Sequence, residues 1–123
     1  MAKSYYEVAL PQSNFKNSIK KFATYIMRIE LKKFGTTLIS RQAGAEAFRA
    51  FQPTLRHLQP GEVLEIDFSG VLTFSPSWGD EFLSPLADQF GDKLFMLASD
   101  NLSVQATLKL LEEIKKQSFA VHK

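Results

Sequence analysis

Two short apolar segments constrain the fold of this chain more than any other feature. Residues 62–68 (EVLEIDF) and 93–98 (KLFMLA) are rich in aliphatic and aromatic side chains and too short for buried helices. Residues 27–32 instead alternate apolar and charged side chains, which is the period of a strand with one buried face. Continuous apolar strands such as 62–68 and 93–98 are typical of sheets that helices cover. We therefore expect an internal sheet built from these segments.

Segments with helical periodicity lie between and after these strands. Residues 40–58, 77–90 and 101–114 place apolar side chains three or four positions apart, as on one face of a helix. Pro53 predicts a kink in the first helix, and Pro85 predicts a kink or a restart in the second. The order of strands and helices predicts a small α/β domain with a mainly parallel or mixed sheet covered by helices. The apolar stripes consist of Ala43, Ala47, Phe48, Phe51, Leu55 and Leu58, then Trp78, Phe82, Leu86 and Phe90, then Val104, Leu108, Leu111 and Ile114.

The length of 123 residues suits a single domain, and no linker or internal repeat divides the chain. The absence of cysteine excludes disulfides and thiolate metal sites and agrees with a reducing compartment. No apolar run approaches the ~18 residues of a membrane span, and the opening segment lacks the apolar region of a signal peptide. We therefore expect a cytoplasmic protein without a membrane partner.

The first third of the chain is basic, although the formal net charge is only +2. This excess indicates either a solvated face or a surface for an anionic partner. No nucleic-acid motif accompanies the lysines, so nucleic acid is not the expected partner. Residues 5–10 favour a strand, and residues 14–25 have helical spacing. We treat residues 1–27 as an N-terminal extension.

The most informative segment is LEIDFSGVLTFSPSWGDEFL, residues 64–83, in which an apolar strand leads into a serine-rich helix start. It resembles the STAS domain of bacterial anti-sigma factor antagonists, where a strand ending in a D-L-S-G-V-like run precedes a helix start. It is also similar to the bacterial STAS-like group DUF4325. The resemblance spans residues 29–114 and implies a STAS-like domain at residues 28–118, followed by a tail at residues 119–123. The matching motifs are Ser40-Arg41, the run from Asp67 through Gly70 to Val71, and Ser77-Trp78-Gly79-Asp80-Glu81.

Ser77 has two interpretations. In register with the antagonists, it falls at the serine that a partner kinase phosphorylates. The resemblance therefore implies a switch, in which a phosphate adds about −1.5 to −2 charges and releases the partner. The structural alternative is that Ser77 caps the helix, while Asp80 and Glu81 lie favourably in its first turn. Ser75 and Pro76 depart from the pattern of the antagonists, and the two carboxylates would repel a phosphate.

Three further residues also have a structural and a functional interpretation. Trp78 stands where the antagonists have a glycine, and is either a core anchor or part of a docking surface. Ser40 is either the N-cap of the helix that follows it or, with Arg41, part of an anion-binding site. Arg41 either holds an anion beside that helix start or pairs with a carboxylate such as Asp67 across the end of the sheet.

The sequence contains no recognisable catalytic or metal-binding pattern. Ser77, His57 and Asp80 supply the residue types of a hydrolase, but no nucleophile elbow is present, and His57 is predicted to face solvent. The only other histidine, His122, lies in the predicted frayed tail, which makes a zinc site unexpected. Asp67, Asp80 and Glu81 could meet at the carboxyl end of the sheet, but they indicate no reaction type. We expect neither an enzyme nor a cofactor nor a metal.

Two hypotheses about function follow. The first is a regulatory module that resembles the anti-sigma factor antagonists and docks on a GHKL-type kinase or an anti-sigma-like ATPase. The second is a sensor that binds an anion or a nucleotide near Arg41, Ser75 and Ser77. The residues expected at the docking surface are Ser75, Ser77, Trp78, Asp80 and Glu81.

Overall fold

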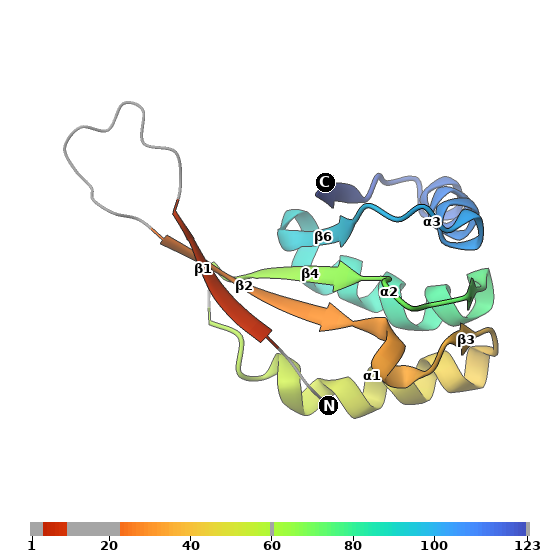
Figure 1. Cartoon of the computed structure of the whole chain (residues 1–123), viewed down its shortest axis with the longest axis horizontal. Helices are drawn as coiled ribbons and strands as arrows, with labels where there is room; N and C mark the ends of the chain where they lie inside the picture. Colours follow the sequence, from red (N-terminus) through yellow and green to blue (C-terminus); the bar gives the residue numbers. More distant parts are fainter. Residues whose placement is uncertain (1–3, 10–22, 60, 123) are drawn as a thin grey trace.

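The computed structural model describes residues 4–9, 23–59 and 61–122. A five-stranded sheet runs through it, with β1 at one edge and β7 at the other (Figure 1). β1 is antiparallel to β2, and the other neighbouring pairs are parallel. The α/β class and the mainly parallel sheet are therefore confirmed. In spatial order the strands are β1 (Ser4–Ala9), β2 (Ala23–Glu30), β4 (Val63–Asp67), β6 (Leu94–Leu97) and β7 (Ala120–His122).

Three α-helices connect the parallel strands, and each begins at the end of the molecule toward which β2, β4 and β6 point (Figure 1). A second, small parallel sheet joins β3 to β5 at the same end. Two short 3-10 helices, η1 and η2, follow β2 and α2. The bounds are α1 (Arg41–Leu55), α2 (Pro76–Phe90), α3 (Leu102–Lys115), β3 (Thr37–Leu38), β5 (Thr73–Phe74), η1 (Leu31–Phe34) and η2 (Gly91–Lys93).

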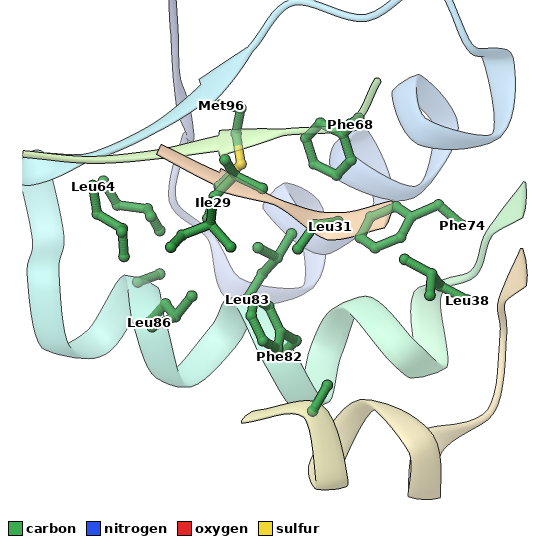
Figure 2. Close-up of a cluster of buried hydrophobic side chains, with 14 of the residues drawn as sticks. Ile29, Leu31, Leu38, Leu64, Phe68, Phe74, Phe82, Leu83, Leu86 and Met96 are labelled. Carbon is green, nitrogen blue, oxygen red and sulfur yellow. The ribbon is translucent and has the colours of Figure 1, made fainter. Parts of the chain in front are cut away.

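The hydrophobic core lies between the sheet and α2. Figure 2 shows Phe82, Leu83 and Leu86 of α2 pointing toward Ile29 and Leu64 of the strands, and all five side chains are fully buried. Aromatic rings form the part of the core nearest the start of α2, where Trp78 stacks on Phe82 with 5.0 Å between ring centroids. The apolar periodicity of the sequence thus predicts the buried faces of β2, β4 and α2.

Helices α1 and α2 approach each other closely at a glycine. A Cβ atom added to Gly44 would lie 2.6 Å from the backbone oxygen of Trp78, so only glycine allows this spacing. Pro53 and Pro85 lie inside helices that run uninterrupted, and the predicted restart at the second proline is wrong. Packing of the two helices against each other compensates for the backbone hydrogen bonds that the prolines remove.

Three expectations about the ends of the domain need correction. Residues 23–26 belong to β2 rather than to a helix, and the rest of the predicted helix lies outside the described residues. His122 lies in β7 rather than in a frayed tail, because this segment pairs with β6. Ile114 was expected in the core, but 61% of it is exposed, since it lies in the last turn of α3, beyond the buried Val104, Thr107 and Leu111.

Candidate functional site

The loop that follows β4 positions the start of α2. Asp67 ends β4, and its Oδ1 accepts a hydrogen bond of 2.9 Å from the backbone N–H of Ser69. Gly70 then adopts a φ of 85°, a conformation that glycine reaches without strain. The backbone N–H of Val71 closes the turn on the carbonyl of Phe68. Asp67 and Gly70 thus shape this loop.

Ser75, not Ser77, caps α2. The Oγ of Ser75 accepts a hydrogen bond of 3.2 Å from the N–H of Trp78 and donates one of 2.7 Å to the carbonyl of Ile39. Pro76 occupies the first helical position, so Ser77 is the second residue of the helix and is half-buried. The structural interpretation of Ser77 as the N-cap is therefore wrong by two residues.

Trp78 is a core residue. Only 1% of it is exposed, and its ring packs against Phe34, Phe74 and Phe82 at centroid distances of 5.0 to 6.0 Å. The core interpretation is thus confirmed, and the side chain has no surface left to offer a partner. Because a truncated Trp78 would leave a large cavity, its substitution cannot test docking independently of folding.

Arg41 joins α1 to the first turns of α2. Its Nη1 lies 3.1 Å from Oδ2 of Asp80 and 2.7 Å from Oε2 of Glu81. The predicted pairing of Arg41 with Asp67 is wrong, because the close approach of α1 and α2 brings the helical carboxylates nearer. Ser40 does cap α1, as predicted, since its Oγ accepts a hydrogen bond of 3.0 Å from the N–H of Ala43.

The charges around Arg41 perturb one another. The hydrogen bond to Glu81, followed by that to Asp80, raises the pKa of Arg41. The pKa of Asp80 is lowered, chiefly by the Ser84 hydroxyl, which donates a hydrogen bond of 2.7 Å to Oδ1, and secondly by Arg41. With two carboxylates on its guanidinium, Arg41 offers little positive charge to an incoming anion. The hydroxyl of Ser75 already donates one hydrogen bond and accepts another within the protein, so it also has little capacity to bind an anion.

Exposed aliphatic side chains at this end of the molecule were not anticipated from the sequence. Ile39, Leu72 and Leu102 are 52%, 69% and 78% exposed, and we call them the apolar rim. Hydrogen bonds fix two of these segments to helix starts: Ser75 Oγ donates to the carbonyl of Ile39, and Asn101 Nδ2 donates to the carbonyl of Leu72 at 3.0 Å. Leu102 directly follows Asn101. One signal in the sequence could have predicted this surface: Leu102 follows the N-cap Asn101 but lies outside the apolar stripe of its helix.

A buried charge on the other face of the sheet was also missed. Glu65 is 3% exposed, and its Oε1 lies 2.9 Å from both Nε and Nη2 of Arg28 on β2. Its Oε2 lies 2.8 Å from Nδ1 of His122, whose ring stacks on Phe95 at a centroid distance of 3.8 Å. The sequence could not reveal this cluster, because β7 was not recognised as a strand.

Neither a metal centre nor a membrane segment is found in the part of the chain that the structure describes. No three histidine or acidic side chains there are grouped to hold a metal ion. None of the helices described combines the length and apolar character needed to cross a bilayer. Comparison of the chain with protein-family models, curated proteins and solved structures finds no match.

Proposed function

We propose that this protein is a docking module that binds a protein partner through the apolar rim and the adjoining start of α2. The observation that supports this proposal is the exposure of Ile39, Leu72 and Leu102 at one end of the domain. Exposed apolar groups that gather at one place are a feature of protein interaction sites, whereas scattered ones are ordinary. The half-buried Ser77 lies beside the rim, two residues after the cap that holds Ile39.

The polar groups at this end favour binding over catalysis. The hydroxyl of Ser75 and the side chains of Arg41, Asp80 and Asn101 are all engaged within the protein. A nucleophile would need a base within hydrogen-bonding distance, and Ser77 has no side-chain hydrogen bond to any residue that the structure describes. Polar groups satisfied in this way form a stable frame around an apolar contact surface.

The resemblance to anti-sigma factor antagonists suggests the class of partner. We place the chain, as a proposal, among STAS-like bacterial regulators and propose a GHKL-type kinase or anti-sigma-like ATPase as the partner. The order of β4, Asp67, Gly70 and the serine-rich start of α2 supports this reading. Phosphorylation of Ser77 would place a third negative group beside Asp80 and Glu81, so repulsion and desolvation would both oppose docking.

The decisive experiment changes the apolar rim without touching the core. Leu72→Glu combined with Leu102→Glu should abolish complex formation with a purified GHKL-type ATPase of the same organism, measured by gel filtration. Both side chains are mostly exposed, and a glutamate in the first turn of α3 suits the helix dipole, so folding should be retained. Tyr25→Glu is the matched control, because Tyr25 is 50% exposed on β2, away from the rim. The proposal would be contradicted if the Tyr25→Glu control also lost binding, or if the double variant still bound the partner.

The switch at Ser77 has its own test. Ser77→Asp should weaken the complex at least about tenfold, because it introduces a charge into the docking surface, while Ser77→Ala should bind like wild type. Equal binding by both variants would show that Ser77 does not regulate docking. The test is independent of the rim variants, so one part of the proposal can fail while the other survives.

A further inference from the structure

A groove lies between α3 and the β6–β7 edge of the sheet, on the face of β6 that carries Met96. Its volume is about 480 Å³, within the range of sites that hold small molecules. Residues from β6, α3 and the segment 119–121 line it. The carboxylates and serines near the start of α2 do not contribute, so the groove is distinct from the proposed docking surface.

The walls of the groove are apolar. Met96 and Val104 are fully buried at its base, and Phe119 is 8% exposed. Leu108 lines the helical side, and Val121, which is 50% exposed, lies at the mouth. The groove therefore favours a hydrocarbon-like group.

Two of the polar residues that line the groove form hydrogen bonds within the protein, whereas a third forms none with the described residues. Gln105 Nε2 donates a hydrogen bond of 2.7 Å to the carbonyl of Ser99, and Glu112 Oε2 accepts one of 2.7 Å from the N–H of Phe119. Lys109 also lines the groove, but makes no ion pair or side-chain hydrogen bond with any residue that the structure describes. A free ammonium group beside an apolar surface can pair with one anionic group.

From these observations we propose that the groove binds an apolar small molecule with a single anionic head, of the class of medium-chain carboxylates. The chain of the ligand lies against Leu108, Phe119 and Val121, and its carboxylate pairs with Lys109. Burial of hydrocarbon supplies most of the affinity, because each buried CH₂ contributes about 0.8 kcal/mol, while an exposed ion pair contributes much less. The lysine accordingly selects the charge of the ligand rather than its size.

Decanoate is the probe that tests this site, with decylammonium as its counterpart of opposite charge. Titration calorimetry should show saturable decanoate binding that weakens as the carbon chain is shortened. Lys109→Glu should weaken decanoate binding about tenfold or more and favour decylammonium, because the head group then meets a like charge. Lys93→Glu is the matched control, since the substitution of this exposed lysine at the end of η2 makes the same charge change outside the lining of the groove.

A second variant tests the apolar wall. Val121→Trp should place a large ring at the mouth of the groove and reduce decanoate binding at least about tenfold, with thermal unfolding used to confirm that the domain still folds. Absence of saturable binding to the wild type would overturn the proposal. So would equal decanoate binding by all four proteins, or a preference of the wild type for decylammonium.

Discussion

On one face of the sheet, Leu64 and Ile66 of β4 pack against apolar side chains, whereas on the opposite face Glu65 joins Arg28 and His122. The first face is held by many similar contacts, none of which is individually specific. The second depends on a buried carboxylate whose partners must be at defined positions. Neighbouring residues of one strand therefore contribute to stability through different physical effects.

The largest effect is expected on the apolar face. Phe82→Ala should lower the free energy of unfolding by about 3 to 5 kcal/mol, because Phe82 is fully buried and its ring contacts Trp78, Phe51 and Phe34. Chemical denaturation monitored by circular dichroism measures the loss. If Phe82→Ala lowered the free energy of unfolding by less than Arg28→Leu does, the apolar face would not be the more important for stability.

The opposite face should give the next largest effect. Arg28→Leu should cost about 3 kcal/mol, because it leaves the buried carboxylate of Glu65 without its guanidinium partner. Glu65→Leu should cost less, since the side chains of Arg28 and His122 are about one-third exposed and can hydrate.

The double variant Arg28→Leu with Glu65→Leu tests whether the unpaired carboxylate causes this loss of stability. It should be more stable than Arg28→Leu alone, because no uncompensated charge remains in the interior. Denaturation of the four proteins of this cycle gives the coupling energy. Simple addition of the two single effects would mean that the carboxylate is not the source of the cost.

Polar groups on the helical side should contribute less. Ser75→Ala should destabilise the domain by about 1 kcal/mol, the usual contribution of an N-cap, while Ser77→Ala should change stability little. Thermal unfolding of both variants decides which serine caps α2. The reverse result would restore the interpretation taken from the sequence.

The smallest effect concerns the dependence of stability on pH. Because the folded pKa of Asp80 is lowered, its stabilising contribution is present above the ordinary aspartate pKa of about 3.9 and is lost as the pH falls through the folded value. Ser84→Ala removes the largest cause of this shift. NMR titration should therefore find a higher pKa for Asp80 in the variant, and the stability difference due to this charge should disappear in acid.

Elements buried against the helices could be predicted, since burial imposes a periodicity on their own residues. The apolar runs at β4 and β6 and the stripes of α1 and α2 are of this kind, except that Ala43 is exposed and Leu58 lies beyond the end of α1. The cap of α2 could also have been found, because a proline is favoured at the first helical position and Pro76 therefore points to Ser75 as the N-cap.

Features that depend on distant parts of the chain could not be predicted. The partners of Arg41 follow from the close approach of α1 and α2 at Gly44, which local periodicity does not encode. β7 has only three residues, and it is a strand because β6 offers an edge for pairing. The apolar rim likewise combines residues from two loops and from the start of α3, which only the fold brings to one end of the domain.

The contact between Glu65 and His122 also bears on the order in which the molecule can be completed. The two residues are 57 positions apart, so a ribosome adds the histidine well after the strand that contains the carboxylate. While residues 119–122 are still inside the ribosome, the nascent chain can form α1, α2 and the strands that they cover. It cannot yet form the hydrogen bond between His122 and Glu65. This hydrogen bond to the carboxylate therefore forms only after residues 119–122 have left the ribosome.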